Sequence, residues 1–266
     1  MRCSTYRLDN NFAGKNFAVT IVGCGGTGGF AAEGLCRILP PEVHLALIDP
    51  DRVEERNLTR QNFTREDLGQ VKSEALARRL ANKYNRPISY SIYPVAMAQL
   101  QTPGLIIGCV DNGLARRDIA EMVRHKLNLY PYSSQVSWWI DAGNGENYGQ
   151  ILIGNRADFA SYYAKEDSGI FTALPLPTIQ RPDLLKQVPQ PQPRDCAQVA
   201  AEQGPTINQA MAALVVEVVR RLIEGTCSWM QLYLDLEKGT LQPVFADPEV
   251  LKDMKIKTIK EVKRER

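Results

Sequence analysis

Short apolar runs alternate with amphipathic segments over the first half of the chain. A short apolar, β-branched run that ends in glycines predicts a buried strand at 17–22, and further strands are predicted at 43–48, 88–93, 105–110 and 135–140. Between them, apolar residues at helical spacing predict helices at 27–39, 70–84 and 113–128. Strands that alternate with helices need crossover connections. We therefore expect an α/β, Rossmann-like fold with a doubly wound, mainly parallel sheet.

The second half of the chain has a different pattern. One more strand is predicted at 148–153, and seven prolines then fall between residues 175 and 205. Because proline cannot continue a helix or occupy a central strand, we expect most of residues 155–205 to form a long crossing loop. The remaining predicted elements are an apolar helix at 206–224 and an antiparallel C-terminal hairpin formed by 229–236 and 240–245.

Composition and charge narrow the range of partners. Apolar residues make up 44% of the 266 positions, charged residues 23%, and the net charge is +2, so neither disorder nor a nucleic-acid or anionic-membrane partner is indicated. No apolar run approaches the roughly 18 residues that a membrane span needs, and the first residues lack the apolar core of a signal peptide. We therefore expect a cytoplasmic protein with reduced thiols. None of the six cysteines forms a C-x-x-C pair, so no zinc is expected.

A glycine-rich turn joins the first predicted strand to the first predicted helix. Gly23, Gly25 and Gly28 satisfy G-x-G-x-x-G, with Gly26 between them. Without Cβ atoms, the backbone N–H groups of such a turn can cradle phosphate at a helix N-terminus. Asp49 follows the second predicted strand, roughly 20 residues on, where a carboxylate can accept hydrogen bonds from a ribose. The pattern predicts a nucleotide site, and taken alone it favours NAD or NADP.

The residues after the second predicted strand change that assignment. From Asp49 to Gln61 they have the form D-x-D-x-V-E-x-x-N-L-x-R-Q, and Lys72 and Asp111-Asn112 follow at the next helix and a later strand end. In these motifs the chain resembles the adenylating superfamily that includes ThiF, MoeB and the ubiquitin-activating enzymes. This resemblance implies ATP-dependent adenylation of the C-terminal carboxylate of a small ubiquitin-like protein of the β-grasp kind, similar to ThiS.

The same resemblance implies a role for each residue of the motifs. Arg60 and Lys72 stabilise phosphate charge, and Asp111 holds Mg²⁺. The set expected to bind ATP is Gly23, Gly25, Gly26, Gly28, Asp49 at the ribose, Asp51, Asn57, Arg60, Gln61, Lys72 and Asn112. Asn57 and Gln61 either contact phosphates or order the loop. Plainer interpretations remain, with Arg60 and Lys72 as solvated charges and Asp111-Asn112 as the cap of the next helix.

The resemblance is strongest over residues 15–155 and returns at Arg194-Asp195-Cys196. Cys196 lies shortly before the apolar helix, where ThiF-like enzymes hold a reactive thiol, and Arg194 favours its thiolate form. The resemblance therefore implies transfer of the activated carboxylate to Cys196, as a thioester or, from a persulfide, as an acyl disulfide. A loop cysteine without a chemical role is the alternative.

The family also implies the domain organisation and the oligomeric state. We expect one ThiF-like domain over 1–266, with a nucleotide-binding half (1–154), the crossing loop (155–205), a C-terminal helix with strands (206–250) and a basic tail (251–266). A homodimer is expected, although the N-terminus lacks the R-Y-x-R-Q motif that supplies an arginine to the partner's ATP site, leaving Arg2 or Arg7 as substitutes. Length, few cysteines and the run from Asp141 to Gln150 look most like the ThiF-family protein of PRTRC gene clusters.

Two other functions stay open. An NAD(P)-dependent oxidoreductase accounts for the segment from Gly23 to Asp49, but it gives no reason for Arg60, Gln61 and Lys72. A non-catalytic nucleotide-binding scaffold is consistent with the unusual N-terminus. Within the adenylating chemistry, a peptide terminus or a tRNA carbonyl group is a further possible substrate, and the near-neutral composition gives tRNA little support.

Overall fold

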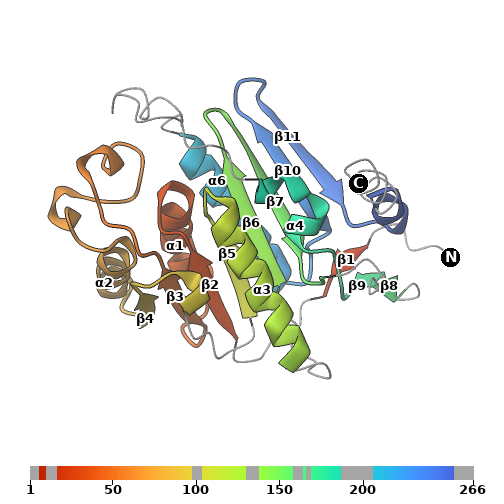
Figure 1. Ribbon diagram of the computed structural model, residues 1–266, viewed down its shortest axis with the longest axis horizontal. Helices are drawn as coiled ribbons and strands as arrows, with labels where there is room; N and C mark the ends of the chain where they lie inside the picture. Colours follow the sequence, from red (N-terminus) through yellow and green to blue (C-terminus); the bar gives the residue numbers. More distant parts are fainter. Residues whose placement is uncertain are drawn as a thin grey trace.

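The sheet that organises the chain has eight strands. In the computed structural model, which describes residues 6–9, 17–97, 104–129, 138–157, 164–165, 169–186 and 206–254, they lie in the order β11-β10-β7-β6-β5-β2-β3-β4 (Figure 1). The parallel strands are β2 (Ala18–Val22), β3 (His44–Ile48), β4 (Ile88–Ser91), β5 (Gly104–Gly108) and β6 (Trp138–Asn144). The antiparallel strands that follow are β7 (Tyr148–Gly154), β10 (Trp229–Asp235) and β11 (Thr240–Phe245). The predicted doubly wound sheet with antiparallel C-terminal strands is confirmed.

The direction of winding reverses at β2. From β2 the chain passes through α1 (Gly26–Ile38), β3, α2 (Lys72–Tyr84) and β4 on one side, and it then returns to β5 on the other side of β2. All five residues of β2 are buried, as expected for a central strand covered on both faces. The carboxyl ends of β2, β3 and β5 therefore meet at a topological switch point, which is where sheets of this kind bind ligands.

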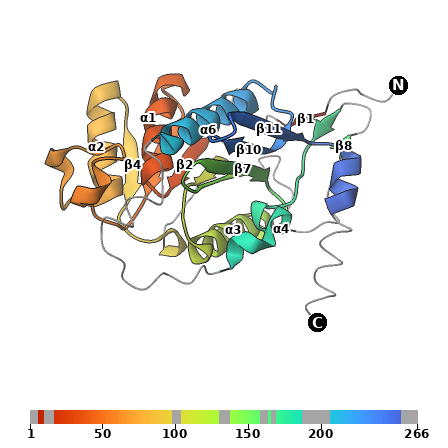
Figure 2. The ribbon, with the colours of Figure 1, turned by 90° about the horizontal axis from the view of Figure 1, so that it is seen from above.

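Two helical layers cover the sheet (Figure 2). α1, α2 and α6 (Ile207–Ile223) lie on one face, and α3 (Gly113–Leu129) and α4 (Pro177–Gln180) lie on the other. α6 packs closely along α1, because a Cβ on Gly34 would overlap the side chain of Val216. Successive residues of β6 point to opposite faces of the sheet. Trp138 packs in the core under α1 and α6, and Trp139 packs in the core under α3.

The described part of residues 155–205, predicted as a crossing loop, contains short strands and helical turns. β9 (Ile170–Phe171) pairs with β1 (Arg7–Leu8) and β8 (Ala164–Lys165) in a small sheet. Pro177 and Pro182 each begin a short helical turn, which is the position that tolerates a missing N–H. The fully buried Asn155 anchors the segment, donating to the carbonyl of Thr172 and accepting from the N–H of Leu174. The rest of the predicted loop, including Cys196, lies outside the described residues.

One predicted strand ends later than expected. The sequence predicts a strand at 135–140, whereas β6 runs to Asn144 and pairs with β7 along its polar end. Asp141 can stay in this buried strand because Arg116 on α3 supplies an ion-pair partner. The other predicted helices and strands differ from the structure only at their ends.

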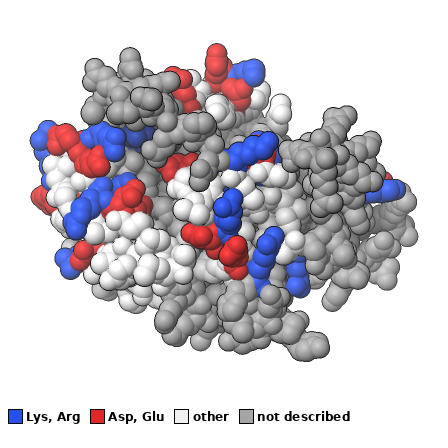
Figure 3. All heavy atoms as spheres, in the orientation of Figure 1, with Lys and Arg blue, Asp and Glu red and all other residues white. Residues whose placement is uncertain are grey.

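Helix length and surface charge were both foreseen from the sequence. Within the part of the chain that the structure describes, no helix is both long and apolar enough to cross a bilayer. On the face drawn in Figure 3, acidic and basic side chains are interspersed, as the near-neutral composition predicts.

A half-buried carboxylate links α1, α2 and the loop between β3 and α2. Glu33 accepts hydrogen bonds from Lys83 Nζ at 2.7 Å, Tyr84 Oη at 3.0 Å and Asn62 Nδ2 at 3.0 Å. Burial alone would raise the pKa of Glu33, but these hydrogen bonds outweigh it and lower the pKa from 4.5 to about 2. The folded state therefore stabilises the ionised form of the Glu33 carboxyl group.

We expect this cluster to make stability depend on pH. Because the pKa of Glu33 is lower in the folded than in the unfolded state, its contribution is present above about pH 4.5 and is lost as the pH falls towards 2. Urea unfolding should show that Glu33→Gln is less stable than wild type by about 1–2 kcal/mol at pH 7, with a smaller difference at pH 3. The exposed Glu42→Gln is the control. A difference that stays constant with pH would contradict the prediction.

Candidate functional site

The glycine loop after β2 is packed against its own backbone. Gly23 has a φ of +89°, which a side chain would strain, and a Cβ on Gly28 would overlap the carbonyl oxygen of Gly23. Gly25 is different: its nearest neighbour is the side chain of Gln61, with Nε2 at 3.7 Å from the place a Cβ would occupy. Since α1 begins at Gly26, the loop also presents the first N–H groups of that helix.

Asp49, which follows β3, is bound to the glycine loop. Its Oδ2 accepts the N–H of Cys24 at 2.7 Å, and its Oδ1 accepts the N–H of Asp51 at 2.9 Å. Burial raises the pKa of Asp49, and the charge of Lys72 and the two N–H groups oppose this increase. Each carboxylate oxygen keeps a second lone pair, so the group can still accept a hydrogen bond from a sugar hydroxyl.

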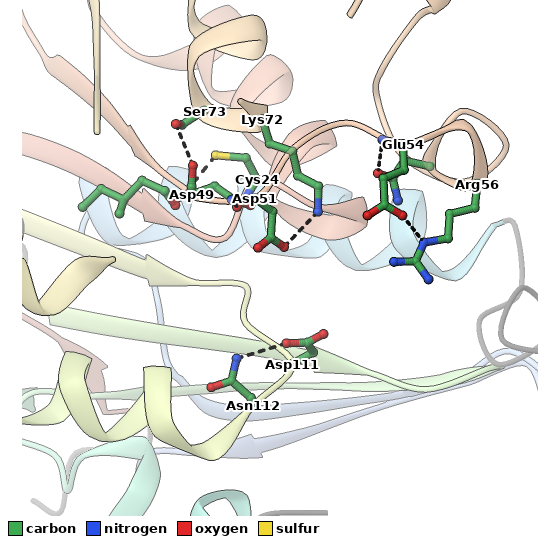
Figure 4. Close-up of polar contacts among 11 residues, drawn as sticks. Cys24, Asp49, Asp51, Glu54, Arg56, Lys72, Ser73, Asp111 and Asn112 are labelled. Carbon is green, nitrogen blue, oxygen red and sulfur yellow. Dashed lines mark hydrogen bonds and ion pairs between the residues drawn. The ribbon is translucent and has the colours of Figure 1, made fainter. Parts of the chain in front are cut away.

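Lys72 begins α2 and reaches back to Asp51. Its Nζ lies 3.1 Å from Asp51 Oδ2, and its N–H donates to the carbonyl of Asp51 at 2.8 Å. The Lys72 side chain is only 11% exposed, whereas that of Asp51 is 69% exposed. Figure 4 shows this pair beside Asp49 and Cys24. A cation is thus held at the switch point, and its partner carboxylate faces solvent.

Two short turns shape the loop that joins β3 to α2. They are η1 (Glu55–Asn57) and η2 (Arg65–Asp67). Asn57 is buried and its Oδ1 accepts the N–H of Glu54 at 2.9 Å, so it orders the loop. Arg79 on α2 donates to the carboxylate of Asp67 at 2.8 Å and to the carbonyl of Asn62. The loop is therefore fixed at both turns.

Arg60 and Gln61 lie where this loop returns to the glycine loop. The carbonyl of Arg60 accepts a hydrogen bond from Asn208 Nδ2 at 3.1 Å, and the Gln61 side chain covers Gly25. Gln61 Oε1 is buried and has no hydrogen-bond partner among the described residues. The structure thus brings this part of the predicted motif next to the glycine loop.

Asp111 and Asn112 follow β5 on the other side of the switch point. Asn112 caps α3, since its Oδ1 accepts the N–H of Ala115 at 2.8 Å, and its Nδ2 donates to Asp111 Oδ1 at 3.2 Å. Both residues are exposed, and in Figure 4 Asp111 lies across from Asp51 and Lys72. Helix capping therefore explains Asn112, while the carboxylate of Asp111 stays accessible. Within the described residues, no three His, Cys, Asp or Glu side chains are grouped to hold a metal ion.

Of the two proposed substitutes for the N-terminal arginine, only Arg7 lies among the described residues. Arg7 lies in β1, in the small sheet at the opposite end of the molecule from α2 (Figures 1 and 2). Arg2 lies outside the described residues. Arg7 therefore lies far from the site of its own chain, and a role in a partner's ATP site stays a prediction.

Sequence reasoning missed two polar groups next to the site. Asn144 at the end of β6 and Asn208 at the start of α6 are hydrogen-bonded to each other at 3.0 Å. Arg116 on α3 pairs with the fully buried Asp141, its Nε lying 3.1 Å from both carboxylate oxygens. The available signal was the pair of polar residues Asp141 and Asn144 directly after an apolar strand, but nothing local identifies their distant partners.

The described cysteines are poor nucleophiles. Burial raises the pKa of Cys24 well above its usual value, that of Cys36 to about 11, that of Cys109 to about 12 and that of Cys227 to about 11. Each of these residues is therefore a neutral thiol at physiological pH. They offer no alternative to Cys196, which lies outside the described residues.

Known proteins match both the sequence and the fold. Ubiquitin-like modifier-activating enzyme 5 of Drosophila virilis is 32% identical over 152 residues, which are 50% of this chain and 35% of that enzyme. Among solved structures, PaaA aligns with a TM-score of 0.59 at 16% identity, over 88% of this chain and 73% of its own. Escherichia coli MccB with ATP aligns with a TM-score of 0.57 at 17% identity, over 87% of this chain and 64% of MccB. These structural similarities establish the shared fold.

The chain spans only about a third of the length of the curated relative, so that enzyme's activity does not transfer with the match. The ThiF family model, in contrast, matches residues 8–241, which is most of the sequence. The matched region includes the glycine loop, the loop from Asp51 to Lys72, and α6. This chain belongs to the ThiF family.

Proposed function

We propose that this protein binds Mg·ATP at the switch point and transfers AMP to a carboxylate. The observation that carries the proposal is the Lys72–Asp51 pair beside the glycine loop, with the exposed Asp111 across from it (Figure 4). A dinucleotide-binding site needs the glycine loop and Asp49, but it has no use for a buried lysine at the start of α2. Among solved structures with a similar fold, MccB has been solved with ATP, which supports this choice of nucleotide.

The residues present fit ATP. Gly25 places no side chain between the loop backbone and Gln61, α1 begins directly after Gly25, and each carboxylate oxygen of Asp49 keeps a lone pair for a ribose. Asp111 is an accessible carboxylate of the kind that Mg²⁺ accepts together with phosphate oxygens. When bound there, the ion would neutralise phosphate charge and orient the triphosphate. A site with one protein carboxylate is typical of magnesium bound along with a nucleotide.

Basic side chains of this protein stabilise the transition state in the proposed reaction. In the proposed reaction a carboxylate oxygen forms a bond to the α-phosphorus of ATP, the bond from that phosphorus to the β-bridging oxygen breaks, and pyrophosphate leaves. Negative charge grows on the phosphate oxygens during this exchange. Lys72 and Arg60 stabilise it, and positioning on a rigid sheet edge lowers the barrier further.

ATP–pyrophosphate exchange tests the proposal. Wild-type protein with its carboxylate substrate should incorporate labelled pyrophosphate into ATP, because adenylation is reversible until the acyl group moves on. Exchange that needs the added carboxylate supports the proposal. ATP binding without exchange for any candidate carboxylate would favour a nucleotide-binding scaffold.

The substrate we propose is the C-terminus of a β-grasp, ubiquitin-like protein. The support is the similarity to ubiquitin-like modifier-activating enzyme 5, together with the likeness of residues 141–150 to the ThiF protein of PRTRC clusters. A peptide terminus, another substrate that the sequence leaves open, is the comparison in the same assay. Titration of exchange with each class separates the two.

We also propose a homodimer. The support is the family resemblance and the apolar surface on the second half of the sheet, where Tyr148, Leu241 and Phe245 are all at least 46% exposed. Sedimentation at micromolar concentration should show a species of twice the chain mass, and a monomer alone would contradict it.

Cys196 is the proposed acceptor thiol. Its segment, 187–205, joins Lys186 to Thr206; Leu185 packs against Gly113 beside Asp111, and Asn208 packs against the glycine loop. The two ends are therefore anchored on opposite sides of the proposed site. In the transfer, the Cys196 sulfur forms a thioester with the acyl carbon and AMP leaves.

Cys196→Ala should separate the two steps. Exchange should stay within about twofold of wild type, because Arg60, Lys72 and Asp111 are untouched, while the covalent, thiol-sensitive complex with the protein substrate should disappear. Gel analysis with and without reductant measures the complex. Cys227→Ala is the matched control, since its thiol is buried. A complex that survives in Cys196→Ala would show that another nucleophile is used.

A further inference from the structure

A buried amide joins three segments that are distant in the sequence. Asn208, the second residue of α6, is 1% exposed, and its Nδ2 donates to the carbonyl of Arg60 at 3.1 Å. Its Oδ1 accepts from Asn144 Nδ2 at 3.0 Å. Asn144 Oδ1 in turn lies 3.3 Å from the hydroxyl of Thr27, in the first turn of α1. Asn208 therefore connects α6, the end of β6 and the loop that carries Arg60.

The hydrogen bonds of this group run in one direction. Thr27 donates to Asn144 and also lies 3.5 Å from Asn208 Oδ1, Asn144 donates to Asn208, and Asn208 donates to the carbonyl of Arg60. Bonds arranged in such a chain strengthen one another, and a buried group of this kind costs stability when one member is lost. The end of the chain is a backbone carbonyl, which makes the position of Arg60 depend on Asn208.

The side chain of Asn208 also contacts the glycine loop. A Cβ at Gly26 would overlap the amide group of Asn208, so the two are in direct contact where α1 begins. Asn208 thus lies between the glycine loop and the loop from Asp51 to Lys72. Only a side chain with both a donor and an acceptor satisfies Asn144 and Arg60 together.

We propose that Asn208 is a positioning residue for phosphate binding, which keeps Arg60 at the glycine loop through the hydrogen bond to its carbonyl. The inference rests on the proposed function, because it assigns Arg60 to the phosphates of ATP. Asn208 does not act on the substrate itself. Its effect passes through Arg60, and this makes it distinguishable from a residue that only holds α6 in place.

Asn208→Asp removes the donor to Arg60 and keeps the shape and the acceptor. Calorimetric titration of the full chain with Mg·ATP should show roughly tenfold weaker binding, the effect of one lost hydrogen bond to a buried acceptor. Asn155→Asp is the matched control: its amide is also buried, donates to a backbone carbonyl at 3.0 Å and accepts a backbone N–H at 2.9 Å. It should lower Tm by a similar amount, roughly 2–6 °C, yet leave ATP affinity within about twofold.

A double-mutant cycle shows whether the effect passes through Arg60. In an Arg60→Ala background, Asn208→Asp should change ATP affinity by less than about twofold, because the side chain it positions is gone. Asn144→Ala, which loosens Asn208 without adding a charge, should weaken ATP binding about threefold and serves if Asn208→Asp does not fold. Unchanged ATP affinity in Asn208→Asp would overturn the role proposed for Asn208 and leave the proposed function intact. The same holds if Asn208→Asp lowers ATP affinity equally with and without the Arg60 side chain. Wild-type protein that binds no ATP overturns the proposed function and the inference with it.

Discussion

Replacing Arg60 or Asp111 by alanine is expected to lower ATP–pyrophosphate exchange by roughly 10²–10³-fold, the usual effect of losing one preorganised charge at a reacting centre. Arg60 is tied by its backbone to Asn208 beside the glycine loop, and Asp111 is exposed at the end of β5. Asp111 makes no contact that the core needs, and for Arg60 the backbone contact survives the substitution. The urea midpoint of Asp111→Ala should therefore stay near wild type, and Arg60→Ala should still unfold cooperatively, while exchange is lost in both.

Two control variants test whether the loss of exchange is specific to Arg60 and Asp111. Arg56→Ala removes an exposed arginine of the same loop, which pairs with Glu54 at 2.6 Å on the surface, and Asp118→Ala removes a carboxylate from α3. Both should keep exchange within about threefold of wild type, as expected of surface charges. Near-normal exchange in Arg60→Ala and Asp111→Ala would refute the proposed catalytic roles.

Arg116→Met is expected to be the most destabilising of the single substitutions considered. Asp141 is fully buried and Arg116 is 6% exposed, so their ion pair is shielded from water. Burial raises the pKa of Asp141, and the neighbouring guanidinium opposes that increase. Removing Arg116 leaves a buried carboxylate without its partner, which typically costs about 3–5 kcal/mol.

Urea unfolding at pH 7 measures this cost. The double variant Arg116→Met/Asp141→Leu should be more stable than Arg116→Met alone, because it removes the unpaired charge as well. Arg181→Met is the matched control, since Arg181 pairs with Asp183 at 2.7 Å but both are well exposed, and it should cost less than about 1 kcal/mol. Equal losses in Arg116→Met and Arg181→Met would contradict the prediction.

The fold was predictable because its signals are local. The central parallel strands β2, β3 and β5 are short apolar runs, and β2 is followed by Gly23, where a Cβ would overlap the carbonyl of Cys109. The motif from Asp49 to Gln61 follows a predicted strand. Because the carboxyl ends of parallel strands meet at one edge of the sheet, its acidic and basic residues could be expected at that edge. The family match over residues 8–241 agrees with that interpretation.

What could not be predicted depends on contacts between distant residues. Asn208 bonds to a carbonyl 148 positions earlier, and no local pattern separates it from any polar residue near a helix start. Arg116 reads as a solvated helix charge until Asp141 is placed opposite it. The same pair explains why β6 continues through a polar run that otherwise resembles a turn.

The central claim is that the switch point binds Mg·ATP rather than a nicotinamide dinucleotide. Calorimetric titration of the full chain with Mg·ATP and, separately, with NADH tests it most directly. Lys72 and Arg60 beside the glycine loop predict that Mg·ATP binds more tightly than NADH, and that Lys72→Met weakens the binding of ATP. Binding of NADH with no binding of ATP would contradict the claim and assign the site to a nicotinamide-dependent enzyme.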